Sequence, residues 1–281
     1  MVEGFKFDAY SPAEIADRVE KVGVAKANLD AFTTIVLAVL AGAFIGMGAE
    51  LATLAGTDSG LGFGPNKLLM GAAFSLGLIL VVVAGAELFT GNNLIVMAWA
   101  SRHISTGQLL RNWVLVLNGN LIGSLATAAF VYLTQIWTMD GHKVGATALL
   151  IANSKVGLPF MVALTRGILC NTLVCLAVWL CFGARSVVDK ILAIVFPITA
   201  FVASGFEHSI ANMYFIPLGL MLKGDSSVLE AAGKTAADMT NLTVWGFFVR
   251  NLIPVTIGNI IGGGVMVAAV YWFAYLRRSV D

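Results

Sequence analysis

Six apolar stretches dominate this sequence, and each is at or beyond the roughly 20 residues that a helix needs to cross a bilayer. They cover residues 31–56, 68–100, 112–137, 158–183, 191–222 and 244–276. Hydrophobic residues make up 58% of the chain, charged residues 12%, and the mean hydropathy is +0.87, values outside the range of soluble domains. The sequence therefore predicts an all-α polytopic membrane protein with one transmembrane domain over residues 31–276. The net charge of +1 argues against a nucleic-acid partner.

Two of these stretches carry the same polar motif inside apolar sequence. Glu87 is followed five residues later by Asn92, and Glu207 is followed at the same offset by Asn212. Carboxylates and amides are costly in hydrocarbon, so their matched placement indicates a transport pathway. Both stretches are too long for one straight helix, and we expect each helix to be broken at its motif. We expect the two carboxylates to hold these breaks in shape, because a carboxylate in contact with an anionic substrate would repel it.

Further matched residues indicate an internal repeat with halves at about 21–137 and 155–276. Each half contains three apolar stretches, so the second half must be inverted relative to the first. Glycines four residues apart predict close helix packing in the repeated parts. The matches are Lys21-Val22-Gly23 with Lys155-Val156-Gly157, Asn112 with Asn251, Gly119 and Gly123 with Gly258 and Gly262, and Tyr132 with Tyr271.

Residues 1–30 are rich in charged side chains and lack the apolar core of a cleavable signal peptide. Ser11, Pro12 and Glu14 predict the start of a helix with a capping box. We interpret this segment as a cytoplasmic amphipathic helix. It either packs at the membrane interface and on neighbouring subunits or regulates the mouth of a pore.

The distribution of Lys and Arg favours an orientation with both termini in the cytoplasm. Ten of the 17 basic residues fall in the termini and connections on that side of the predicted topology. Residues 277–281 then form a cytoplasmic tail, and the protein is predicted to reside in the inner membrane as a multi-pass protein.

His208 is the only histidine predicted at membrane depth, and an imidazole exchanges protons near neutral pH. Helices restarting after the two breaks direct their positive N-terminal ends inward, which suits a small anion. An enzyme using Glu207, His208 and Ser209 together is disfavoured, because neighbouring residues on a helix point about 100° apart. The cysteines all fall in the fourth stretch and form no metal-ligand or disulfide pattern, so no metal or cofactor is predicted.

Three segments, residues 87–92 (ELFTGN), 205–213 (GFEHSIANM) and 251–259 (NLIPVTIGN), resemble the signature motifs of the formate/nitrite transporter family. The resemblance covers essentially the whole chain and is strongest to the formate channels of that family. It implies an aquaporin-like fold of six transmembrane helices with the second and fifth broken. It also implies a homopentamer in which each protomer carries a pore, and a transport protein rather than an enzyme. A neutral-solute channel of the aquaporin type is a distant alternative, since neither break carries Asn-Pro-Ala.

The resemblance places a central site on His208, with Thr90 as its partner in the first break. It implies apolar constrictions on either side of this pair, pore asparagines, and a basic residue near the external mouth. These roles fall on Phe74, Leu78, Leu88 and Phe201 for the constrictions, Asn171 and Asn259 for the asparagines, and Lys155 for the basic residue. The implied substrate is formate, with nitrite and hydrosulfide as alternatives within the same family.

A carboxylate crosses dry apolar rings only at high cost, whereas its neutral acid crosses readily. We therefore hypothesise that the anion is drawn in by Lys155 or the cytoplasmic vestibule and takes a proton from His208, which Glu207 and Thr90 orient. In the alternative, the histidine is structural and anions pass when the constriction widens.

Overall fold

The computed structural model describes residues 10–277, and every regular element in that range is a helix. The predicted features at residues 1–9 and most of the predicted tail, residues 278–281, lie outside this range. The α-helices are α1 (Pro12–Asn28), α2 (Ala31–Gly56), α3 (Phe63–Ile79), α4 (Val96–Ala100), α5 (Thr106–Leu133), α6 (Lys143–Val156), α7 (Phe160–Gly183), α8 (Val187–Ala203), α9 (Ser209–Leu222), α10 (Ser226–Ala231), α11 (Ile253–Ile260) and α12 (Val270–Tyr275). The π-helical segments are η1 (Leu80–Gly85), η5 (Gly246–Leu252) and η6 (Ile261–Ala269), and the 3₁₀ turns are η2 (Gly91–Ile95), η3 (Ile136–Thr138) and η4 (Ala236–Met239).

Five of the six apolar stretches overlap a described helix that is long and apolar enough to cross a membrane. These helices are Ala31–Gly56, Phe63–Gly85, Thr106–Leu133, Phe160–Gly183 and Gly246–Tyr275. The remaining stretch is divided between α8, with 17 residues, and α9, with 14. Helix α6 was not predicted, because its 14 residues carry a lysine near each end and therefore do not form a long apolar stretch.

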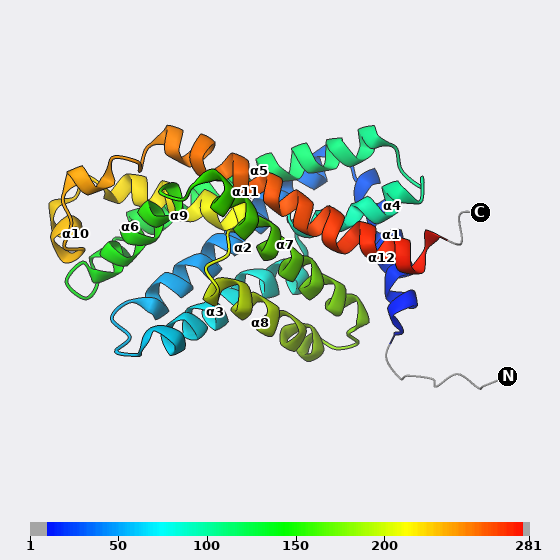
Figure 1. Cartoon of the computed structure of the whole chain (residues 1–281), viewed down its shortest axis with the longest axis horizontal. Helices are drawn as coiled ribbons and strands as arrows, with labels where there is room; N and C mark the ends of the chain where they lie inside the picture. Colours follow the sequence, from blue (N-terminus) through cyan, green and yellow to red (C-terminus); the bar gives the residue numbers. More distant parts are fainter. Residues whose placement is uncertain (1–9, 278–281) are drawn as a thin grey trace.

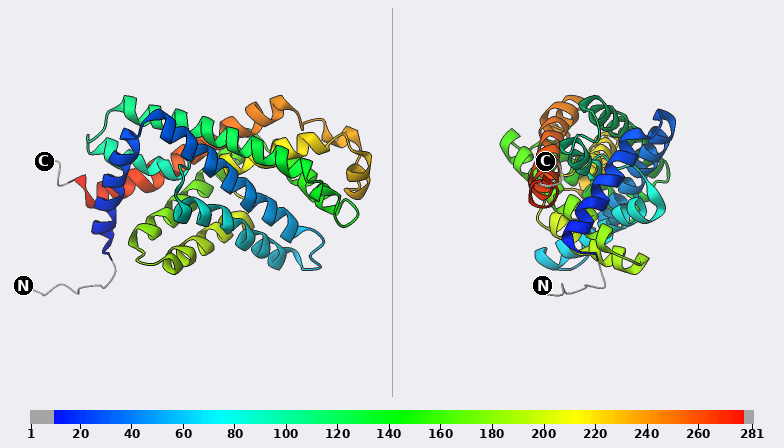
Figure 2. Two further views of the ribbon diagram at one scale, coloured as in Figure 1. Left: turned by 180° about the vertical axis from the view of Figure 1, so that it is seen from behind. Right: turned by 90° about the vertical axis from the view of Figure 1, so that its right-hand side faces the viewer.

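The helices are arranged in contacting pairs that recur along the chain. Helix α2 packs against α5, and α7 packs in the same way against α11. Helices α3 and α8, which each lead into a break, lie side by side in Figure 1 and contact each other. Helices α1 and α12 lie together at one end of the molecule, and α10 lies at the opposite end (Figures 1 and 2).

The start of α1 confirms the predicted cap. The Ser11 side chain accepts the Glu14 backbone N–H, and the Glu14 carboxylate accepts the Ser11 backbone N–H at 2.7 Å. The apolar face of α1 is buried through Ile15 and Val19 against the C-terminal part of α7 and against α12. The cap therefore begins a helix that packs on the helical bundle.

A glycine with positive φ precedes the acidic residue in each of the two non-helical connections. Gly85 has φ +86° at the end of η1, and Gly205 has φ +69° after α8. Only glycine adopts such angles without strain. The backbone therefore leaves the helix at Gly85 and at Gly205, two residues before Glu87 and Glu207 respectively. The helical structure resumes at Gly91 in η2 and at Ser209 in α9.

Close helix contacts confirm the packing predicted at the repeated glycines. A Cβ atom on Gly123 of α5 would overlap the Val39 carbonyl of α2, and a Cβ on Gly262 would overlap the Ile168 carbonyl of α7. Each pair therefore brings backbone against backbone, as small residues allow in membrane helices.

Candidate functional site

A hydrogen-bonded histidine and threonine lie where the two non-helical connections meet. The Nε2 atom of His208 is 3.1 Å from Thr90 Oγ1, and both residues are buried. The Ala211 backbone N–H donates to His208 Nδ1 at 3.1 Å, so the imidazole caps the N-terminus of α9. Because Nδ1 must accept that bond, the proton of the neutral ring is on Nε2, which donates to the Thr90 hydroxyl.

Aromatic side chains cover the imidazole on one side. The Phe201 ring stacks on His208 with centroids 5.9 Å apart and 22° between the planes. The Phe74 ring meets Phe201 edge-on, with centroids 5.5 Å apart. The predicted constriction residues Leu78 and Leu88 are buried and line a cavity that is also lined by Gly91, the residue after Thr90. The structure therefore places Phe201 against His208 and Phe74 against Phe201, and all four predicted constriction residues belong to one buried hydrophobic cluster.

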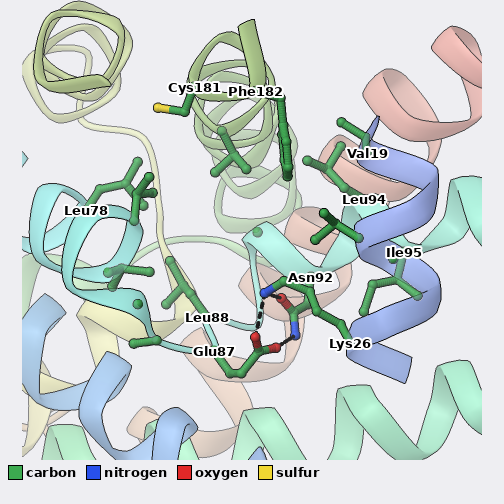
Figure 3. A pocket seen from close by; sticks show the side chains of 18 of the residues that line it. Val19, Lys26, Leu78, Glu87, Leu88, Asn92, Leu94, Ile95, Cys181 and Phe182 are labelled. Atoms are coloured by element: carbon green, nitrogen blue, oxygen red, sulfur yellow. Dashed lines mark hydrogen bonds and ion pairs between the residues drawn. The ribbon is translucent and has the colours of Figure 1, made fainter. Parts of the chain in front are cut away.

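This cavity has a volume of about 400 Å³ and is bounded by residues of α1, α2, η1, η2 and α7 (Figure 3). Its wall is mostly apolar, and its polar side chains are Lys190 of α8 and one hydrogen-bonded cluster. Lys26 Nζ donates to Glu87 Oε1 at 2.6 Å and to Asn92 Oδ1 at 3.0 Å, and the Asn92 amide donates to Glu87 Oε2 at 2.6 Å. Asn112 completes the cluster by accepting from the Asn92 amide at 3.0 Å and donating to the Lys26 carbonyl at 3.2 Å.

The second connection is held by a cluster built on the same plan. Lys155 Nζ donates to Glu207 Oε1 at 3.0 Å, and the Asn212 amide donates to Glu207 Oε2 at 2.7 Å. Asn251 accepts from the Asn212 amide at 2.7 Å and donates to the Lys155 carbonyl at 3.0 Å. Glu207 is 4% exposed and Lys155 13% exposed, so this ion pair is shielded from solvent. Each cluster neutralises a buried carboxylate and fixes its loop to two other helices.

Buried asparagines also clamp the loop backbones. The Asn120 side chain accepts the Phe89 N–H at 2.9 Å and donates to the Glu87 carbonyl at 2.9 Å. Asn259 does the same for the Ser209 N–H at 2.9 Å and the Glu207 carbonyl at 3.0 Å. These bonds satisfy loop N–H and C=O groups that have no partner within a helix, as a helix break at membrane depth requires.

Asn171 joins the two halves. Its amide donates to the carbonyl of Asn259 at 2.7 Å and to the carbonyl of Thr90 at 3.2 Å. The amides of the two asparagines predicted to line the pore therefore bond to backbone carbonyls, and Asn171 fixes the Thr90 carbonyl beside the central pair.

Two details differ from the sequence interpretation. The cation paired with Glu87 is Lys26, whereas Lys21, which was matched to Lys155, is exposed and pairs with Asp17. The predicted role of Glu207 in orienting the imidazole is wrong, because its carboxylate oxygens bond to other groups and the ring is held by Thr90 and a backbone N–H. In the structure Lys26 and Lys155 both lie in the last turn of a helix that precedes a spanning helix.

Among residues 10–277, no group of three or more His, Cys, Asp or Glu side chains is placed to hold a metal ion. The three cysteines are buried and free, and Cys175 lies beside the central loop, where its Sγ is 3.3 Å from the Thr90 carbonyl. The polar chemistry of this region therefore comes from amides, hydroxyls, an imidazole and two ion pairs.

Comparison with known proteins identifies the family to which this arrangement belongs. The family model described as "Formate/nitrite transporter" matches residues 13–273. The chain belongs to the formate/nitrite transporter family. The formate/nitrite transporter match spans both Lys–Glu–Asn clusters and the His208 and Thr90 pair.

Relatives within the formate/nitrite transporter family match over nearly their full lengths. The chain is 45% identical to the formate channel FocA of Escherichia coli (strain K12), with 97% of each protein covered. It is 38% identical to the formate channel FocA of Haemophilus influenzae, with 92% of each covered. A solved structure described as a pentameric formate channel with formate bound matches with a TM-score of 0.82 and 44% identity, covering 88% of this chain and 98% of that one.

Proposed function

We propose that this chain is a channel for formate and related small monovalent anions, with a pore through each protomer of a homopentamer. The observation that carries the proposal is the hydrogen-bonded pair of His208 and Thr90, enclosed by apolar side chains where two loops meet. The similarity to FocA and to a pentameric formate channel with formate bound supports both the substrate and the assembly.

We further propose that the fold is an aquaporin-like inverted repeat of six transmembrane helices. The second would comprise α3, η1, η2 and α4, and the fifth would comprise α8 and α9, each broken at its acidic loop. Support comes from the two clusters, whose lysine, glutamate and paired asparagines have the same pattern of bonds. Three spans in each half make the second half inverted, so the two clusters belong to opposite mouths of one pathway.

In this proposal the protein lies in the inner membrane with both termini in the cytoplasm. The positions of α1 and α12 at one end of the molecule support termini on one side. The cavity beside Lys26 is then the cytoplasmic vestibule, and Lys155 belongs to the external mouth. Apolar side chains exposed along the spanning helices, such as Phe130 and Phe196, suit contact with lipid or neighbouring subunits.

The conduction step follows from the cost of moving an anion past dry rings of Phe and Leu. The anion meets the Nε2–H of His208 and the Thr90 hydroxyl, which replace part of its hydration. We propose that a proton then passes from Nε2 to a carboxylate oxygen, so that the neutral acid crosses the apolar ring. For this step to balance, Nδ1 must first take a proton from water on the side of entry and release the Ala211 N–H, and the transfer then leaves a neutral imidazole with its proton on Nδ1.

Glu87 and Glu207, with Asn92 and Asn212, serve in this proposal as structural support for the loops. Their carboxylate oxygens are held by lysine and asparagine donors. This arrangement keeps the buried negative charge neutralised and away from the permeating anion.

The test is uptake of formate, nitrite and hydrosulfide into liposomes containing the purified protein, measured across external pH. The variant His208→Phe is compared with His208→Asn, because asparagine retains the capability to cap α9. Formate uptake with a pH dependence that is lost in both variants supports the proposal. Larger nitrite or hydrosulfide uptake overturns the choice of substrate, and an unchanged pH dependence in both variants overturns the proton transfer.

A further inference from the structure

Arg166 is a charged side chain within the spanning helix α7, and it has no partner in the described structure. It is partly buried, and its guanidinium forms no hydrogen bond, ion pair or ring contact with any of residues 10–277. A charged group in a membrane-spanning helix is costly, and one that pairs with no protein group points to a function.

One side-chain contact and one backbone bond place Arg166 at the loop that carries the central histidine. One of its terminal nitrogens lies 3.9 Å from the point where a Cβ on Gly205 would be. The Arg166 carbonyl also accepts the Glu207 backbone N–H at 3.3 Å. Arg166 is therefore anchored directly beside the segment that leads into His208.

The first half of the chain has Leu37 at the equivalent position. The Leu37 carbonyl accepts the Glu87 backbone N–H at 3.2 Å, as the Arg166 carbonyl does for Glu207. Leu37 lines the cavity shown in Figure 3. Leu37 is an apolar residue in the wall of the mouth beside Lys26. By this equivalence Arg166 takes the same wall position at the mouth beside Lys155.

The lysines of the two mouths also differ in their free donors. Lys26 hydrogen-bonds to both Glu87 and Asn92, whereas within the described residues Lys155 hydrogen-bonds only to Glu207 and lies 5.3 Å from the centroid of the Phe215 ring. The Oδ1 atom of Asn212, which corresponds to the acceptor on Asn92, is buried without a partner in the described part of the chain. The mouth beside Lys155 thus has one uncompensated positive charge and unused N–H groups on two cations.

We propose that Arg166 and Lys155 form an anion-binding site at this mouth, which receives the anion before it reaches His208. This inference rests on the proposed transport function and adds a site to it. The ligand is a small planar anion with two oxygens on one atom, such as formate or nitrite, because a guanidinium donates two parallel hydrogen bonds to such a pair. The equivalent position at the other mouth is Leu37, so an effect of Arg166 on transport is confined to one face of the membrane.

The experiment measures initial uptake of radiolabelled formate, and of nitrite in parallel, by the full-length protein presented from each face. Intact cells of a bacterial host without its own formate and nitrite transport expose one mouth, and inverted membrane vesicles from the same cells expose the other. Membrane potential is abolished and pH is equal on both sides. The readout is the half-saturating anion concentration, because a site at one mouth saturates only when the anion is supplied from that face.

In the preparation that exposes the mouth beside Lys155, we expect Arg166→Leu to raise the half-saturating concentration about three- to tenfold. This is the effect of losing a partly exposed charge-assisted hydrogen bond. In the other preparation the half-saturating concentration should change by less than about twofold. Arg166→Lys retains the positive charge but cannot donate two parallel hydrogen bonds, so it should give an intermediate half-saturating concentration. The matched control is the double variant Leu37→Arg with Arg166→Leu, which moves the charge to the other mouth and should transfer the effect to the other preparation.

An unchanged half-saturating concentration in both preparations, or an equal change in both, overturns the proposal. The same conclusion follows if Arg166→Leu only lowers the thermal stability of the purified assembly, since Arg166 then binds a lipid headgroup or a neighbouring subunit. If the wild-type protein carries neither anion above the host background, the proposed function fails and this site fails with it. Sided effects with nitrite but not formate uptake retain the site and overturn only the choice of formate.

Discussion

The ion pair of Lys155 and Glu207 gives a stability prediction whose size can be worked from the structure. Glu207 is 4% exposed and its partner 13%, with Nζ and Oε1 3.0 Å apart. The substitution Lys155→Met removes the charge and keeps most of the side-chain volume. Removing one member of a buried pair costs about 3–5 kcal/mol, because the remaining charge is left unpaired. Asn212 and Asn251 still donate to Glu207, so we expect a value near the lower limit.

The assay is thermal unfolding of the detergent-solubilised protein, followed by tryptophan fluorescence at one fixed scan rate. At about 2–4 °C per kcal/mol, a loss of about 3 kcal/mol lowers the midpoint by about 6–12 °C. Adding Glu207→Gln to Lys155→Met removes the unpaired charge and should recover most of this loss. Lys26→Met should cost less, because that lysine is 27% exposed.

Lys21→Met is the surface control. Lys21 and Asp17 are 72% and 49% exposed, and such pairs contribute about 0–1 kcal/mol. The reasoning is refuted if Lys155→Met shifts the midpoint no more than Lys21→Met does, or if the double variant is no more stable than the single one.

Three further outcomes are expected. Gly262→Ala should reduce the yield of folded protein and lower the midpoint of thermal unfolding, because the alanine Cβ would overlap the Ile168 carbonyl. A wild-type yield and midpoint would contradict this contact. Thr90→Val removes the hydroxyl to which His208 donates and should lower formate uptake into liposomes. The free energy of unfolding should stay within about 1 kcal/mol of wild type, the usual contribution of one hydrogen bond. Unchanged uptake would exclude the hydroxyl from the pathway. Ser11→Ala removes the cap of α1 at a cost of about 1 kcal/mol, and hydrogen exchange should quicken in the first turn of α1 but not in α2.

Apolar length and one repeated motif were enough to predict most of the helical architecture. Five stretches became helices of spanning length, and the cap at Ser11 formed as its residue types predict. The transport roles of the predicted site residues stay predictions, although the structure pairs His208 with Thr90 and places the four apolar residues in one buried cluster that includes Phe201 against His208.

Other features could not be read from local sequence. The choice of Lys26 rather than Lys21 as the partner of Glu87 depends on which face of α1 meets η2, and residues five apart on a helix lie on different faces. The π-helical segments η1, η5 and η6 carry no residue pattern that separates them from α-helix. The isolation of Arg166 could not be predicted either, because whether a charge has a partner depends on residues distant in sequence.

The bonds that cross between the halves have a consequence for how the chain can be divided. The loop at Thr90 is bonded by Asn171 and His208 of the second half, and the first turn of α9 is bonded at the Ile210 carbonyl by Ser124 of the first half. The region around each loop therefore depends in part on bonds from the other half. If the chain were cut in the exposed connection between α5 and α6, neither fragment alone would form a conducting unit. Activity would return only when both fragments were made in the same membrane and docked, so the protein should be suited to complementation by split halves.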